Sequence, residues 1–240
     1  MFHRKIYFVF AVFLHLASSG LWAGDTASFV DLGFSPDGKI YMFGQYGVDS
    51  LTLKPWADLF IVDVSRNNFV NGGRLSYVHD KAVVSGQDGS GALYRLIAQN
   101  ASLAERYKIN YCFQGQPLFI ALSNVNNVVE VFSSMPIEFR DFQNGAFYRA
   151  SLVSSTEGQG AALKSSFYIN LERTSADGSK KTYCVGTPQL KRPLISSYGI
   201  KKVMIAPYDG SMIFLIEMKR VDGTSVDIRY MVEALRLNNY

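Results

Sequence analysis

Few residues of this sequence are of the types that usually carry catalysis. His79 stands beside Asp80, a pair that could exchange a proton with a substrate, although a histidine beside a loop aspartate is more often simply solvated. Neither Cys112 nor Cys184 has a histidine near it in the sequence that would activate a thiolate. The G-x-S-x-G, H-E-x-x-H and P-loop motifs and the Cys/His metal spacings are also absent. We therefore expect no catalytic residue of these kinds, no cofactor and no metal site.

Carboxylates are the remaining candidates for chemistry. Five aspartates gather around one predicted hairpin, namely Asp31, Asp37, Asp49, Asp58 and Asp63. Such oxygens could bind calcium, and two carboxylates at a suitable separation could hydrolyse a glycosidic bond. Aspartates at turns and strand ends more often bond to local backbone groups. A carboxylate-dependent hydrolase of envelope or extracellular glycans therefore stays as the alternative function.

Aromatic side chains offer a chemistry of binding instead. Tyr46 and Trp56 flank an irregular segment, residues 47–55, that joins two predicted strands. Exposed aromatic rings stack on sugars or anchor protein partners, and loops on rigid sheets often carry recognition residues. The main interpretation is a non-catalytic binding or interaction module in which Tyr46 and Trp56 contact an envelope protein or glycan. Replacing Trp56 by alanine should then weaken the contact by about 2 kcal/mol or more.

The N-terminus predicts where the protein acts. Arg4 and Lys5 precede an uncharged apolar run over residues 6–17, and small and polar residues follow it. This is the layout of a secretory signal peptide, here residues 1–23. The run is shorter than the roughly 20 residues that a membrane-spanning helix needs. We expect a periplasmic or secreted protein with no membrane insertion after cleavage, and a single β-rich domain over residues 24–240.

Charge argues against a nucleic-acid partner. The chain has 24 basic and 20 acidic residues, a net charge of +4, and loss of Arg4 and Lys5 would lower this to +2. No run of basic residues stands out in the rest of the chain. Nucleic-acid binding relies on clustered Lys and Arg, so the sequence predicts no such partner.

Export also bears on the two cysteines. Two cysteines in an oxidising compartment are more often bridged than free. We expect a Cys112–Cys184 disulfide, which would stabilise the fold by roughly 4 kcal/mol in the chain-entropy model. Two separately buried thiols are the alternative, because buried cysteine behaves as a small apolar residue.

The elements that would position these residues are mostly strands. Apolar and polar residues alternate in "VDIRYMVEA", and Asp-Gly pairs at 177–178 and 222–223 predict tight hairpin turns, the first between strands 165–173 and 180–186. One segment, residues 91–107, has helical spacing, with Ser90 as its N-cap. The fold class is therefore mainly β, with antiparallel sheets in a sandwich or a partial propeller and one helix packed on the sheet. The other expected strands cover residues 28–34, 40–46, 57–64, 82–85, 118–123, 128–132, 147–153 and 202–206.

A short phrase occurs near both ends of the domain. "FSPDGKIYMFGQYG" at residues 34–47 is similar to "APYDGSMIFLIEMKR" at 206–220. Residues 35–38, Ser-Pro-Asp-Gly, fit a type I turn that feeds a strand. The repetition predicts two related antiparallel hairpins, at about 34–64 and 206–235, that superpose on each other.

Two resemblances follow from these segments. "FSPDGKIYMFGQYG" with "ADLFIVDV" resembles a blade repeat of the β-propeller in the Tol-system periplasmic protein, but residues 65–200 show no further copy. Most of the mature chain, most clearly 29–70 and 199–237, is similar to an uncharacterised family of bacterial predicted secreted proteins. That resemblance implies export and supplies no catalytic residue.

The expected cleavage site gives a direct test. Ala23 is the last small residue before the charge at Asp25, so the mature protein should begin at Gly24. N-terminal sequencing of the exported protein should read Gly-Asp-Thr-Ala. An intact Met1 in the envelope fraction would contradict soluble export and favour an uncleaved anchor.

Overall fold

The computed structural model describes residues 24–121, 135–207, 210–223 and 225–237, and three antiparallel sheets dominate it. The N-terminal sheet has the strand order β1-β2-β3-β4, and the central sheet has the order β13-β12-β11-β5. The third sheet has the order β10-β8-β7-β6, with β9 also paired to β8. The strands are β1 (Ser28–Phe34), β2 (Ile40–Val48), β3 (Pro55–Asp63), β4 (Asn68–Val78), β5 (Gln116–Ile120), β6 (Ile137–Asp141), β7 (Ala146–Glu157), β8 (Lys164–Thr174), β9 (Lys180–Val185), β10 (Arg192–Pro193), β11 (Ile195–Ile205), β12 (Met212–Asp222) and β13 (Ser225–Leu235).

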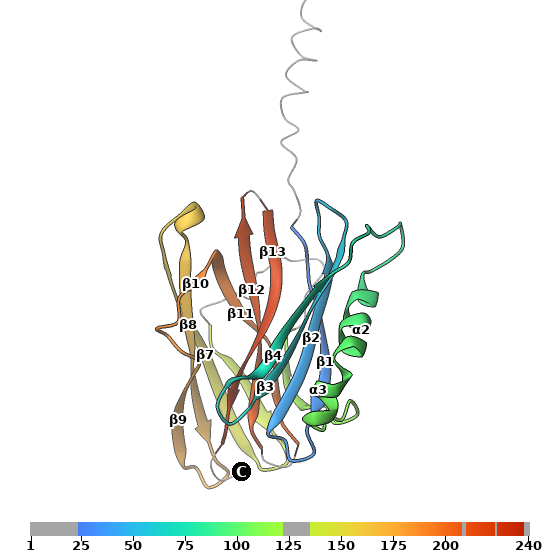
Figure 1. Cartoon of the computed structure of the whole chain (residues 1–240). Coiled ribbons are helices and arrows are strands. Elements are labelled where there is room, and N and C mark those ends of the chain that lie inside the picture. Colours follow the sequence, from blue (N-terminus) through green and yellow to red (C-terminus); the bar gives the residue numbers. More distant parts are fainter. Residues whose placement is uncertain (1–23, 122–134, 208–209, 224, 238–240) are drawn as a thin grey trace, which may run out of the picture.

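The three sheets stack as layers, with the central sheet between the other two (Figure 1). Two helices, α2 (Ser90–Gln99) and α3 (Ala101–Arg106), lie against the outer side of the N-terminal sheet, and a single 3₁₀ turn, η1 (Gly160–Ala162), joins β7 to β8. The predicted fold class, mainly β with antiparallel sheets and a helix packed on a sheet, is therefore confirmed. Sheets stack face to face in a sandwich and in a partial propeller alike, so the choice between these two forms stays a prediction.

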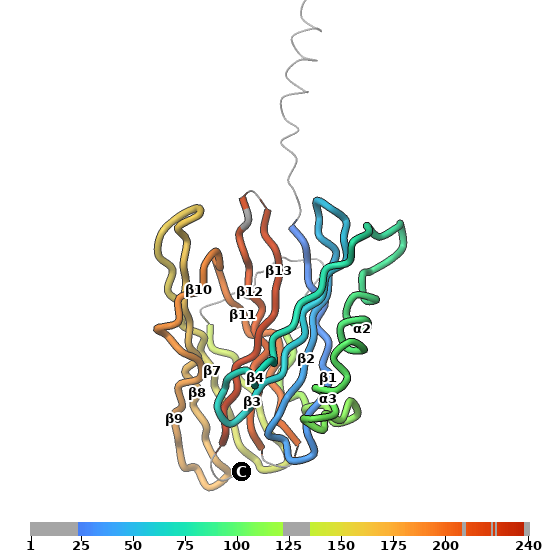
Figure 2. Tube along the Cα trace, viewed as in Figure 1, coloured from blue at the N-terminus to red at the C-terminus, as the bar shows by residue number. Residues whose placement is uncertain are grey.

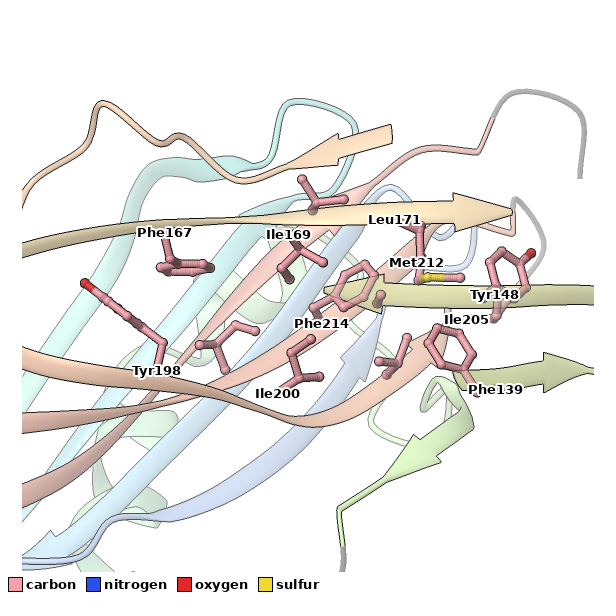
Figure 3. Packing of buried hydrophobic residues seen from close by; sticks show 14 of the residues in the cluster. Phe139, Tyr148, Phe167, Ile169, Leu171, Tyr198, Ile200, Ile205, Met212 and Phe214 are labelled. Carbon is pink, nitrogen blue, oxygen red and sulfur yellow. The ribbon is translucent and has the colours of Figure 1, made fainter. Parts of the chain in front are cut away.

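Strand β12 shows why the central sheet needs apolar residues on both faces. Met212, Phe214 and Ile216 pack toward the third sheet, in the cluster that Figure 3 shows with Phe167, Ile169 and Leu171 of β8. The alternate residues Ile213 and Leu215 pack toward the N-terminal sheet. Since successive strand residues point to opposite faces, burial on both sides produces the unbroken apolar run "MIFLI".

The N-terminal sheet is also covered on both faces. Tyr41 and Phe43 of β2 face the central sheet, whereas Met42, between them, faces the helices. Leu93 and Leu96 of α2 are buried in that outer cluster. The helical segment therefore packs on the sheet as its apolar spacing predicted.

Most of the predicted hairpins are confirmed. β2 pairs with β3, β12 with β13 and β8 with β9, all antiparallel, and β1 has the predicted bounds. The amide of Gly38 donates to the carbonyl of Ser35 at 2.9 Å, which closes the predicted turn. The superposition of the two related hairpins stays a prediction.

Other predictions need correction. The single helix is two, because Asn100 donates its side-chain amide to the carbonyl of Leu96 at 2.9 Å and ends α2, whose N-cap is Gly89 rather than Ser90. Residues 82–85 form no strand, whereas β4 and β6 were not predicted. The expected strand at 128–132 lies outside the described residues.

Truncation of the central core should be costly. Replacing Phe214 by alanine leaves a cavity between two sheets, so unfolding free energy should fall by about 3–5 kcal/mol. Val226→Ala, at an exposed position of β13, is the control and should change it by less than about 0.5 kcal/mol. Urea denaturation measures both, and equal losses would contradict the layered core.

Candidate functional site

A groove of about 740 Å³ lies beside the start of α2. The residues that line it come from the start of β3, the loop between β4 and α2, and the first turns of α2. Its charged and polar side chains are His79, Lys81, Gln87, Asp88, Ser90 and Arg95. The groove is large enough for a peptide segment or a small molecule.

Backbone hydrogen bonds to the loop between β2 and β3 hold the groove in place. The amide of His79 donates to the carbonyl of Pro55 at 2.8 Å, and the amide of Val83 donates to the carbonyl of Leu53 at 2.8 Å. Figure 2 shows these two loops at the same end of the molecule. The sequence segments that form the groove are therefore fixed relative to the sheet.

One glycine permits this close approach. Gly89 has a positive φ of 80°, and a side chain there would place its first carbon 2.8 Å from the carbonyl oxygen of Gly47. Only glycine fits such a contact at such a backbone angle. Gly89 thus serves both the packing of the loop against β2 and the entry into α2.

The groove carries an excess of positive charge. Lys81 and Arg95 line it, and Asp88 is the one acidic side chain among its lining residues. Asp80 lies just outside the groove, with its carboxylate 3.1 Å from a ring nitrogen of His79. The hydrogen bond that the amide of Ser90 donates to Asp88 lowers the pKa of that carboxyl. The first turn of α2 contains no acidic residue, so its helix dipole adds to the positive potential. An acidic ligand would be attracted to this groove.

Apolar side chains protrude at the same end of the molecule. Leu51 and Leu53 of the β2–β3 loop are 68% and 51% exposed, and Val84 of the following loop is 66% exposed. Val78 at the end of β4 is exposed as well. Exposed apolar side chains that gather beside a charged groove are typical of an interaction surface.

Tyr46, one of the two residues predicted to bind a partner, lies next to this groove without lining it. Its side chain is half-buried, and its hydroxyl donates to the carboxylate of Asp88 at 3.4 Å. The contact places Tyr46 beside the polar wall of the groove. Its predicted role in binding is not tested by this position.

Trp56 lies elsewhere, which corrects its predicted exposure in a loop. It belongs to β3 and is only 8% exposed. Its indole N–H donates to Asp25 at 2.7 Å, and the guanidinium of Arg229 stacks on its ring at 4.1 Å. The ring therefore helps to attach the start of the domain, at Asp25, to β3 and β13. Its buried surface is not available for stacking on a partner.

Asp25 makes most of the side-chain hydrogen bonds that attach the start of the domain to β13. Arg229 donates to both of its carboxylate oxygens, at 2.6 and 2.9 Å, and the amide of Asp25 donates to Asp227 at 3.1 Å. Residues 25–27 also bond to the backbone of Ile228 on β13. Burial raises the pKa of Asp25, and the hydrogen bonds from Arg229 and Trp56 oppose this rise.

The five aspartates considered for catalysis each bond to their own surroundings. The acceptor carboxylates and their donors are Asp31 with the amide of Gly33, Asp37 with the hydroxyl of Ser35, Asp49 with the amide of Thr52, Asp58 with Gln45 and Ser76, and Asp63 with the hydroxyl of Ser65. These local contacts in turns and between paired strands explain why aspartate occurs at the five positions. The hydrolase stays an untested prediction.

The predicted disulfide is wrong. Cys112 and Cys184 are both free and exposed. Cys112 directly precedes Phe113, whose backbone carbonyl accepts a hydrogen bond from Phe34 of β1 in the N-terminal sheet. Cys184 lies on β9 in the third sheet, where it pairs with Asn170 of β8. Because the central sheet separates those two layers, the cysteines cannot meet in this fold.

Lys81 and Arg95 were not singled out from the sequence. They lie on separate segments, and only the packing of the β4–α2 loop brings them to one groove. Within the described residues, no cluster of three or more His, Cys, Asp or Glu side chains could hold a metal ion. Over the same ranges, no helix has both the length and the apolar character needed to cross a membrane.

Comparison with known protein families identifies the family of this chain. The family described as Predicted secreted protein (DUF2259) matches residues 42–236, and the chain belongs to it. The family description agrees with the expected export, although residues 1–23 themselves lie outside the described part. No curated protein matches the chain, and the likeness to the Tol-system propeller gains no support from these comparisons.

The role assigned to Trp56 can be tested by stability. Trp56→Phe keeps a ring beneath Arg229 but removes the donor to the buried Asp25, so unfolding free energy should fall by about 1–3 kcal/mol. Tyr94→Phe, on the exposed face of α2, is the matched control and should change little. Thermal unfolding of both variants that shows equal stability would contradict the role of Trp56 in attaching the start of the domain.

Proposed function

We propose that this member of the secreted family is a non-catalytic binding module that captures an acidic segment of an envelope or extracellular protein. The groove beside α2 would hold the segment. The single observation that carries the proposal is the meeting of Lys81, Arg95 and His79 in one large groove that exposed apolar side chains border.

Charge and apolar surface favour the same kind of partner. Basic side chains attract carboxylates and guide their approach, while Leu53 and Val84 offer apolar contacts that add affinity after docking. A segment that alternates acidic and apolar residues would satisfy both features. Tyr46, whose hydroxyl contacts the lining residue Asp88, would lie beside such a segment.

The fixed shape of the groove supports binding of an extended segment. The loop that forms it is tied to the β2–β3 loop by backbone bonds and to α2 by the amide of Ser90. A site that is already ordered loses little conformational entropy when a ligand binds. The scaffold therefore suits recognition better than a loose loop would.

Synthetic peptides test the proposal directly. Fluorescent peptides of about ten residues with alternating valine and glutamate should bind the domain of residues 24–240, and valine–lysine peptides of equal length should not. The double variant Lys81→Glu/Arg95→Glu should weaken binding of the acidic peptide by about tenfold or more. Anisotropy titrations should also show weaker binding as salt rises, since salt screens exposed charges.

A matched charge reversal provides the control. Lys180→Glu/Lys181→Glu changes the same charge on β9, in the third sheet and outside the groove, and should leave peptide affinity unchanged. Binding that ignores peptide charge, or that responds equally to both double variants, would contradict the proposed groove.

A further inference from the structure

A second, smaller pocket lies where the three sheets meet. Its volume is about 130 Å³. Asn67 comes from the turn before β4 and Asn68 from the first position of β4, whereas β13 contributes Glu233. Thr187 comes from the segment between β9 and β10, and Arg192 from β10. Each of the three sheets thus supplies part of one pocket.

The polar wall of this pocket is rigid. Glu233 is 5% exposed, receives a hydrogen bond from the guanidinium of Arg192 at 3.2 Å and receives another from the side-chain amide of Asn67. The oxygen of the same Asn67 amide accepts from the backbone N–H of Ala234 at 2.7 Å. The guanidinium also stacks on the ring of Phe167 at 4.8 Å. The side chains that face a ligand are therefore held in place before it arrives.

The pocket is balanced in charge. Glu233 and Arg192 form a buried ion pair, and the other polar side chains around them are uncharged. A charged ligand would have to displace Glu233 or Arg192 from their ion pair. The displaced side chain would then be an unpaired buried charge, which is costly. The pocket therefore favours an uncharged ligand.

Hydrogen-bonding groups are dense for so small a volume. A guanidinium has five N–H donors, and the described bonds of Arg192 use its two terminal nitrogens on Glu233 and on the carbonyl of Leu190. The amide of Asn68 and the hydroxyl of Thr187 line the same space. Phe69 and Met231 add apolar wall. A ligand that fits carries several hydroxyl or carbonyl oxygens and an apolar face.

Size narrows the choice further. A volume of about 130 Å³ corresponds to about four water molecules at about 30 Å³ each, which is less than a whole hexose occupies. The pocket therefore takes one edge of a ring with its hydroxyls, and the rest of the ring and any continuing chain stay outside. A sugar ring has the required combination of vicinal hydroxyls, no charge and an apolar C–H face.

We propose that the pocket formed by Asn67, Asn68, Thr187, Arg192 and Glu233 binds a single neutral sugar ring of a glycan. The site is separate from the groove beside α2 and does not depend on the peptide binding proposed above. Asn68 and Thr187 contact the ring hydroxyls, and the fixed Glu233–Arg192 pair selects against charged sugars.

Ligand-observed NMR of the domain of residues 24–240 tests the site. Neutral hexoses and N-acetylhexosamines should show saturation transfer from the protein, and glucuronic acid and glucosamine should not. Thr187→Val keeps the side-chain shape but removes the hydroxyl, so affinity for the neutral sugar should fall about fivefold. Asn68→Ala, which removes an exposed side chain, should lower it by a similar factor.

Thr182→Val is the matched control, because it makes the same change at an exposed position of β9 outside the pocket, and it should retain full sugar affinity. Three results would overturn the proposal: no transfer to any neutral sugar, equal affinity in wild type and Thr187→Val, or preferred binding of charged sugars. Competition by the acidic peptide would show instead that this pocket recognises protein.

Discussion

Burial of the central sheet on both faces is the constraint from which the rest of this fold follows. A sheet with one wet face can alternate apolar and polar residues, but β12 must be apolar at every position from Met212 to Ile216. Each of its faces then requires a second sheet that supplies a matching apolar surface. The N-terminal and third sheets provide these surfaces, and the N-terminal sheet in turn needs α2 to cover its other face. The layer order thus follows from the distribution of apolar residues.

Buried ionic groups occur where the layers meet at their margins. Arg229 joins β13 to the start of the domain through Asp25, and Glu233 joins β13 to Asn67 and Arg192 of the two flanking sheets. Burial raises the pKa of Asp25 and of Glu233, so the charged form of each carboxylate depends on the hydrogen bonds that it accepts. Such groups add little net stability, but a layer that shifted would leave a buried charge unpaired. We infer that they fix the alignment of the sheets.

Sequence reasoning succeeded where the determinants are local. Asp-Gly pairs at 177–178 and 222–223 specify tight turns, and the strands beside them pair as predicted. β4 escaped prediction because Gly72 and Gly73 interrupt its pattern and most of its side chains are exposed. The burial of Trp56 depends on Asp25 and Arg229, which lie far from it in the chain, and the separation of the cysteines depends on the layer order. No local pattern encodes those contacts, or the groove that Lys81 and Arg95 share.

The position of the groove follows from the same layering. Side chains on the faces of the sheets are committed to packing, so variable chemistry is left to the loops at the ends of the strands. Here the loop after β4 has to travel from the edge of the N-terminal sheet to α2 on its outer face, and it crosses the β2–β3 loop on the way. Its bonds to Leu53 and Pro55 anchor it to strands whose own positions the core determines. The apolar core, which reaches the groove at Ala92, thereby sets the geometry of the charged surface around it.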